Sequence, residues 1–280
     1  MPPSPISSTR NLPASTRGVE AGRSALIERK LDRARAIAQQ LAAIPFIRFL
    51  ALGNSVAMGT ATELSDLDFF VVTAPNRLWT ARFFLLLVAK FKGLTKRPGR
   101  LSDQADFGFW VDETALDLSA IALLHSTRRV RGQFTRRVKP DSIDDPYLVR
   151  WLATMVLLLD RGGVYKRLMM ANRPLLQTLS PAVMLRPSAE ASQGSFAKLR
   201  MTVMIEGILG SVLGAPLERL LFTIQRWKVW ADPVAHRRDP LLVNGRRVDV
   251  VTTRTMLKLH HFDQRAKLRE QWRFGQRRST

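Results

Sequence analysis

The stretch GNSVAMGTATELSDLDFFVV, residues 53–72, decides what kind of fold this chain of 280 residues adopts. Its last part continues to residue 73 and is apolar and rich in β-branched and aromatic residues, which predicts a buried strand over 67–73. Asp66 and Asp68 lie two positions apart at the start of that strand, so both side chains point to one face, with α-carbons about 6.5 Å apart. Carboxylates that converge in this way can hold divalent ions roughly 3.5 to 4 Å apart.

The segment before these acids suits a phosphate group. Residues 46–52 are almost purely apolar and predict another buried strand. Gly53, Asn54 and Ser55 follow it directly, and small residues there let backbone amides and a hydroxyl approach phosphate oxygens closely. SDLD alone is also typical of a polar turn that enters a strand. The Gly and Ser loop at this distance, between two apolar strands, favours the chemical interpretation.

The two segments resemble the nucleotidyltransferase superfamily of DNA polymerase beta. Its pattern is a hydrophobic residue, Gly and Gly or Ser, some ten residues, then Asp, a hydrophobic residue, Asp or Glu, and a hydrophobic residue. LGNS at 52–55 and SDLDF at 65–69 match this pattern, although Asn54 stands between the Gly and the Ser. The wider stretch 52–119 and the KLHHFDQR segment at 258–265 are similar to predicted bacterial and archaeal nucleotidyltransferases with a helical C-terminal half.

The resemblance implies transfer of a nucleoside monophosphate from a nucleoside triphosphate, with ATP expected, to a hydroxyl group. The acceptor could be RNA, a small molecule or a protein side chain, and the cofactor would be Mg²⁺ or Mn²⁺. In this family's terms Asp66 and Asp68 would be catalytic metal ligands, and residues 53–55 would bind the nucleotide.

The superfamily also has a third carboxylate, on a later strand, that deprotonates the acceptor or completes the metal site. A strand is predicted here at 105–111, and Asp106 at its head is the first candidate for this catalytic role. Asp103 and Asp112 are the alternatives.

Helices are predicted around this core. Their predicted ranges are 18–43, 77–91, about 145–160, an apolar helix after residue 195 that ends near 230 with a break at Pro216, and 253–274. The sequence therefore predicts an α+β fold, in which a small mixed sheet is flanked by helices and followed by a mainly helical C-terminal region. The expected division is a disordered tail at 1–17, a nucleotidyltransferase domain at 18–125 and a helical domain at 126–280.

Composition restricts the partners and the location. The chain has 44 Lys and Arg against 23 Asp and Glu, a formal charge of +21, which favours polyanions such as RNA, nucleoside triphosphates or anionic lipid. It has no cysteine, so disulfides and thiolate metal sites are excluded. We find no signal peptide and no apolar stretch long enough to span a bilayer, so we expect a cytoplasmic protein, for which membrane-surface contact is still open.

Two other interpretations compete with the enzyme. One is a basic RNA-binding or membrane-surface protein whose transferase domain is catalytically degenerate, and the other is an interaction module of a toxin and antitoxin pair. Trp227, Trp230 and Trp272 have helical spacing and apolar neighbours, which predicts packing positions. His260 and His261 are adjacent on a predicted helix and point about 100° apart, so we expect no shared metal ion there.

Overall fold

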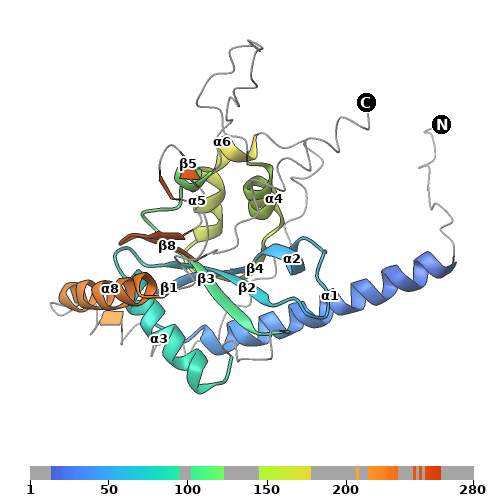
Figure 1. Ribbon diagram of the computed structural model, residues 1–280, viewed down its shortest axis with the longest axis horizontal. Helices are drawn as coiled ribbons and strands as arrows, with labels where there is room; N and C mark the ends of the chain where they lie inside the picture. Colours follow the sequence, from blue (N-terminus) through green and yellow to red (C-terminus); the bar gives the residue numbers. More distant parts are fainter. Residues whose placement is uncertain are drawn as a thin grey trace, which may run out of the picture.

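A six-stranded mixed sheet forms the centre of the structure (Figure 1). The computed structural model describes residues 14–94, 102–122, 145–177, 206–207, 214–232, 242–243, 246–247 and 250–259. The strand order is β4-β1-β2-β3-β8-β7. The strands are β1 (Ile47–Leu52), β2 (Leu67–Thr73), β3 (Ala105–Asp112), β4 (Val156–Asp160), β7 (Val250–Thr252) and β8 (Met256–Leu259).

Seven α-helices accompany this sheet in the described ranges. They are α1 (Ala14–Leu41), α2 (Asn54–Ala57), α3 (Leu78–Phe91), α4 (Pro146–Thr154), α5 (Val164–Ala171), α6 (Arg173–Leu176) and α8 (Gly214–Trp230). The short elements are the 3-10 turn η1 (Ser119–Ile121) and a separate pair of strands, β5 (Leu242–Val243) and β6 (Arg246–Arg247). The fold is thus mixed α/β. Among the described helices none combines the length and the apolar character that a membrane span requires.

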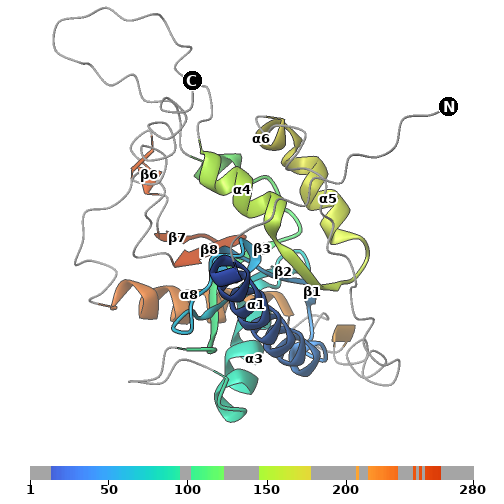
Figure 2. The same ribbon diagram turned by 90° about the vertical axis from the view of Figure 1, so that its right-hand side faces the viewer.

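Helices cover both faces of the sheet (Figures 1 and 2). Alternate residues of each strand point to opposite faces, so one strand supplies two cores. On β2, Phe69 and Val71 pack in the core that includes α1 and α3, whereas Phe70 and Val72 pack in the core that includes α4 and α5. Asp68 lies two residues before Phe70 in the same strand, so its side chain points to the same face of the sheet, the one covered by α4 and α5.

The three central strands agree with the sequence prediction. β2 and β3 are found where the apolar runs placed them, β1 begins at Ile47, and α3 covers the sheet as expected. β2 pairs with β1 in antiparallel fashion and with β3 in parallel fashion. The long crossover through α3 makes the parallel pairing possible, because two parallel strands cannot be joined by a tight turn.

Two predicted helices are wrong. The helix expected at about 145–160 ends at Thr154, and the apolar residues after it form β4, which pairs with β1. The helix expected from residue 253 is replaced in its first part by the β7 and β8 hairpin, and β8 pairs with β3. In both cases short apolar runs became strands because a sheet edge was available, so tertiary pairing overrode local propensity. Residues 260–274 lie outside the described residues.

The N-terminal boundary also differs from the prediction. α1 begins at Ala14, inside the tail expected at 1–17, of which residues 1–13 lie outside the described residues. α8 begins at Gly214, so Pro216 lies in its first turn, where the amide hydrogen that proline lacks would have no partner within the helix. Residues 208–213 directly before α8 lie outside the described residues, so the predicted break at Pro216 stays a prediction. The boundary near residue 125 stays a prediction about folding units, but three of the six strands come from beyond it.

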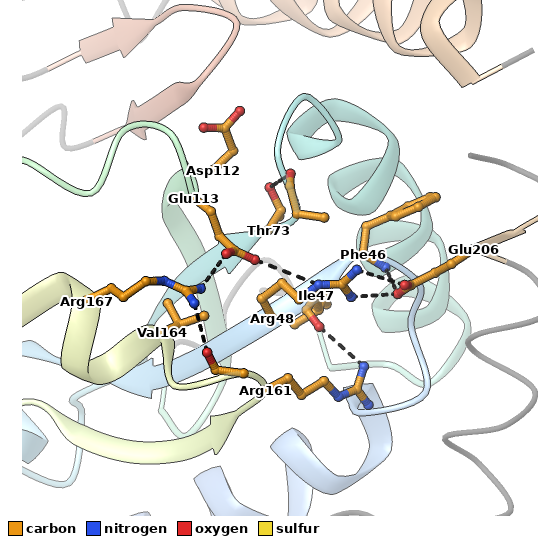
Figure 3. A network of polar contacts seen from close by, with 12 residues as sticks. Phe46, Ile47, Arg48, Thr73, Asp112, Glu113, Arg161, Val164, Arg167 and Glu206 are labelled. Atoms are coloured by element: carbon orange, nitrogen blue, oxygen red, sulfur yellow. Dashed lines mark hydrogen bonds and ion pairs between the residues drawn. The ribbon is translucent and has the colours of Figure 1, made fainter. Parts of the chain in front are cut away.

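An ion-pair network closes one end of the sheet (Figure 3). Arg48 at the start of β1 donates two hydrogen bonds of 2.8 Å to the carboxylate of Glu206, and the amide of Phe46 donates a third of 2.6 Å. The side chain of Arg48 also lies 3.8 Å from Glu113, which pairs with Arg167 of α5. The network therefore ties Glu206, far along the chain, to the first strand.

We expect the Glu206 contacts to be acid-sensitive. Burial raises the pKa of Glu206, but hydrogen bonds from Arg48 and Phe46 outweigh burial and leave the pKa below its ordinary value of 4.5. A carboxyl whose pKa is lowered by folding stabilises the protein above its ordinary pKa, and this contribution is lost as the pH falls through the folded value. Glu206→Gln should therefore lower the free energy of unfolding by about 1 to 3 kcal/mol near neutral pH.

Denaturant unfolding of wild type and Glu206→Gln, at neutral pH and at about pH 3, checks this expectation. The difference between the two proteins should shrink at the lower pH. Glu28→Gln is the control, because Glu28 lies on the exposed face of α1 and pairs there with Arg35, whose side chain is also largely exposed. A difference that is equally large at both pH values would contradict the assignment.

Candidate metal and nucleotide site

Three aspartates meet where β2 and β3 begin. Asp66 directly precedes β2, Asp68 lies in it, and Asp106 lies in β3. Carboxylate oxygens of the three residues, one from each, all lie within 4.8 Å of one another, and each side chain is half-buried. The parallel register explains the arrangement, because Asp68 stands directly opposite Asp106.

A shift in the register keeps Asp106 on the correct face. Asp68 is opposite Asp106, but Phe70 is opposite Phe109, so β3 uses one residue more than β2 over this interval. As a result Phe109 packs on the same face as Phe70, where their ring centroids are 4.9 Å apart. Such irregularities redirect side chains and are common beside active sites.

Three carboxylates at this spacing suit a hard divalent cation. Mg²⁺ and Mn²⁺ prefer oxygen ligands, and carboxylates usually supply one or two of them while water and substrate phosphates supply the others. Asp66 and Asp68 are the predicted metal ligands, and the structure brings them together with Asp106. The donor set therefore fits Mg²⁺, and the partial exposure leaves room for substrate ligands.

The two alternatives to Asp106 have structural partners instead. Asp103 accepts a hydrogen bond of 2.6 Å from Lys30. Asp112, at the far end of β3, is buried and accepts hydrogen bonds from the amides of Asn76 and Thr114 and from the Thr114 hydroxyl. Neither belongs to the three-carboxylate cluster, so of the three predicted candidates the fold selects Asp106.

Lys30 is a positioning residue that sequence reasoning missed. It lies on α1 with no exposed surface, and its ammonium donates to the carbonyls of Glu63 and Ser65 and to Asp103. Ser65 immediately precedes Asp66, so Lys30 holds the loop that leads into the cluster. Its place on the apolar face of α1, three residues after Ile27, was a signal, because a lysine on such a face needs buried partners.

The predicted nucleotide loop lies beside the acids. The amide of Gly53 donates a hydrogen bond of 2.9 Å to the carbonyl of Asp68, which holds the loop against β2. Asn54 and Ser55 form the first residues of α2 and are half-buried. Asn54 has a φ of 52°, in the left-handed region that asparagine tolerates better than most residues. First-turn amides have no partner within their own helix, so they can face a ligand.

Comparison with known proteins identifies no family for this chain. No family model, curated protein or solved structure matches the chain. The function is therefore inferred from the site itself.

Helix α4 forms a wall of the site that sequence reasoning also missed. The hydroxyl of Tyr147 donates a hydrogen bond of 3.0 Å to the side-chain oxygen of Asn54. Trp151, one turn further along, packs on Phe70 and Phe109 with ring centroids 5.1 and 5.3 Å away. Both residues come from the C-terminal half, so that half contributes to the surroundings of the loop at residues 53–55. No local signal distinguishes them from other aromatic residues of an amphipathic helix.

Trp151 explains why residue 53 is a glycine. The backbone at Gly53 is extended, with a φ of −117°, so any residue could adopt it. A β-carbon there would lie 2.4 Å from Nε1 of Trp151, which is a severe overlap. Because Trp151 is buried among aromatic rings, it has little freedom to move aside. Space, rather than backbone conformation, requires glycine at this position.

Gly53→Ala should therefore destabilise the protein by about 1 to 3 kcal/mol, as overpacking does. Trp151→Phe removes the overlapping indole nitrogen, so the double variant should be less destabilised than the sum of the two single variants. Gly22→Ala is the control, because a β-carbon at Gly22 meets no atom within 4 Å. Denaturant unfolding of the four variants measures these differences, and strictly additive effects would contradict the clash.

The tryptophans that were predicted to pack are exposed where the structure describes them. Trp227 and Trp230 on α8 have exposed fractions of 66% and 67%. The prediction of packing positions is wrong for these two residues, because α8 buries a different face through Leu221 and Gln225. Trp272, His260 and His261 lie outside the described residues.

Proposed function

We propose that this protein is a Mg²⁺-dependent nucleotidyltransferase that moves a nucleoside monophosphate from a nucleoside triphosphate to a hydroxyl acceptor. The observation that carries the proposal is the cluster of Asp66, Asp68 and Asp106 beside a loop hydrogen-bonded to Asp68. The resemblance of LGNS and SDLDF to the DNA polymerase beta superfamily supports it independently, since that pattern is a property of the sequence alone. The position of Asp106 on the next parallel strand is consistent with the superfamily's third carboxylate.

The site's residues can be given specific roles in this reaction. Asp66 and Asp68 would hold Mg²⁺, and a bound cation would neutralise the triphosphate and orient it for in-line attack. The amides of α2 and the Ser55 hydroxyl would donate hydrogen bonds to the phosphate oxygens. Asp106 would receive the proton of the acceptor hydroxyl, or complete the metal site. A bond then forms between the acceptor oxygen and the α-phosphorus, and the bond to pyrophosphate breaks.

Transfer of label tests the proposal directly. The purified chain is incubated with ATP or another nucleoside triphosphate, Mg²⁺ or Mn²⁺, and acceptor pools of RNA, metabolites or protein. Label at the α-phosphate should enter one acceptor pool, whereas label at the γ-phosphate should not, because it leaves with pyrophosphate. Transfer of the γ-label would instead indicate a phosphotransferase. Absence of transfer with every nucleotide and pool would overturn the proposal.

A second function is favoured by one observation. Seven of the nine large apolar side chains that are exposed in the described residues lie on α3 and α8. They are Phe83, Leu87, Phe91, Leu220, Ile224, Trp227 and Trp230. Exposed aromatic residues on helices of a strongly basic chain are typical of binding to an anionic membrane surface. The protein would then be a surface-binding protein with a degenerate transferase site.

Vesicle sedimentation separates the two functions. The second one predicts that wild type and Asp68→Asn bind anionic vesicles equally, with or without Mg²⁺, and that Trp227→Ala with Trp230→Ala weakens binding. It also predicts no label transfer. RNA binding that decreases steeply with salt and ignores the tryptophan changes would indicate an RNA partner in place of the membrane.

A further inference from the structure

A pocket lies at the opposite end of β2 from the aspartates. Its volume is about 350 Å³, and its lining comes from the loop after β2, the first turns of α3 and α8, and the turn between β7 and β8. Asp68 is at the beginning of β2, whereas the pocket starts at Pro75, two residues after its end. The length of a seven-residue strand, about 23 Å, separates the two places. The pocket is therefore not part of the metal site.

Three arginines line this pocket from three separate segments. Arg77 precedes α3, Arg219 lies on α8, and Arg254 lies in the turn between β7 and β8. Arg219 and Arg254 are exposed, so their guanidinium groups are available to solvent and to a ligand. The Arg77 guanidinium also donates a hydrogen bond of 3.0 Å to the carbonyl of Asn76 and lies over the ring of Phe46. Cationic side chains from three parts of the chain give the pocket an attraction for anions.

Glu218, the carboxylate among the described lining residues, is already engaged. Glu218 accepts hydrogen bonds of 2.8 Å from the amides of Trp79 and Thr80, and one of 2.6 Å from the Thr80 hydroxyl. It therefore caps the first turn of α3 and ties α8 to it. With Glu218 directed to α3, the lining presents more positive than negative charge to a ligand.

Trp79 connects the segments that form the pocket wall. This residue has no exposed surface, and its indole nitrogen donates to the carbonyls of Thr253 and Arg254, both at 3.2 Å. Its ring meets Phe222 of α8 edge-on, with centroids 5.2 Å apart. One side chain thus joins α3, α8 and the β7 to β8 turn, which are the segments that carry or adjoin the three arginines.

We propose that this pocket binds a small phosphorylated ligand, with its phosphate group on Arg77, Arg219 and Arg254. Guanidinium groups recognise phosphate oxygens through paired hydrogen bonds, which gives both affinity and orientation. The volume corresponds to the lower end of the range for small-molecule sites, about 300 Å³. The same chemistry is offered by a free phosphorylated metabolite and by a phosphomonoester lipid headgroup. The site is independent of the proposed nucleotidyl transfer.

Calorimetric titration in EDTA tests the proposal without the metal site. The soluble probes are inorganic phosphate, glucose 6-phosphate and AMP, and the lipid probe is phosphatidylcholine vesicles with or without phosphatidic acid. Wild type should bind at least one probe at a single site. Arg219→Ala with Arg254→Ala should weaken binding at least about tenfold, because two charge-assisted contacts are lost.

Two further variants make the result specific. Ala215→Trp keeps every charge but fills the pocket from the exposed start of α8, and it should weaken binding to a similar degree. Lys166→Ala with Arg173→Ala removes the same charge from the exposed surface of α5 and α6, and should leave affinity within about twofold of wild type. Binding only of phosphatidic acid vesicles, lost in the arginine variant, assigns the lipid source.

Two results would overturn the assignment. One is an absence of binding to all of these probes. The other is an equal loss of affinity in the α5 and α6 control, since that would show attraction to net charge rather than a site. Failure of this binding test would not bear on the proposed nucleotidyl transfer. That reaction is assigned to the aspartates at the start of β2 and is measured separately.

Discussion

Asp68→Asn is expected to reduce nucleotidyl transfer by roughly a thousandfold while the protein remains folded. Asp68 is adjacent to both other members of the cluster. It lies opposite Asp106 in the strand register and two residues after Asp66 in the chain. The amide keeps the size of the side chain but removes the negative charge that a divalent ion requires. Asp66→Asn and Asp106→Asn should have large effects of the same kind.

Steady-state rates and Mn²⁺ binding by paramagnetic resonance measure this effect in parallel. Asp117→Asn is the matched control, because Asp117 is an exposed residue after β3 and does not belong to the cluster. Its carboxylate accepts a hydrogen bond from the amide of Ser119. Its activity and Mn²⁺ affinity should equal those of wild type. Wild-type rates in all three cluster variants would exclude a metal mechanism at this place, whatever other activity the chain has.

Lys30→Met is expected to lower the free energy of unfolding by about 2 to 4 kcal/mol. The ammonium of Lys30 is wholly buried and joins Asp103 to two backbone carbonyls, and methionine leaves all three acceptors without this donor. Asp103 is 38% exposed, so water compensates for part of its loss. For that reason we expect less than the full penalty of an isolated buried charge.

Arg29→Met provides the control for this prediction. Arg29 is the neighbouring residue on α1 and pairs with Glu63 of the same loop, but both side chains are mostly exposed. Exposed ion pairs are screened by water and salt, so this change should leave the free energy of unfolding almost unchanged. Lys30→Met should also weaken Mn²⁺ binding, since the loop before Asp66 is no longer held. Equal stability of the two variants would contradict the role of Lys30.

Much of the core could be predicted because its signals are local. The apolar runs at 67–73 and 105–111 became β2 and β3, and the alternation of Asp66 and Asp68 with Leu67 placed both acids on one face. These predictions needed only the two-residue period of a strand. The strands β4 and β8 were not predictable in this way, because each forms only where β1 or β3 presents a free edge.

The sequence by itself determined the central strands, the pair of aspartates and the loop of small residues beside them, because strand period and small residues act over a few positions. The tertiary structure alone decided which later aspartate joins the pair, through the parallel register of β2 and β3. It also decided that Lys30 is buried against the loop that leads to Asp66, that Trp151 requires Gly53, and that three distant arginines line one pocket. Each of these depends on contacts between segments far apart in the chain, whose approach is governed by packing rather than by local pattern.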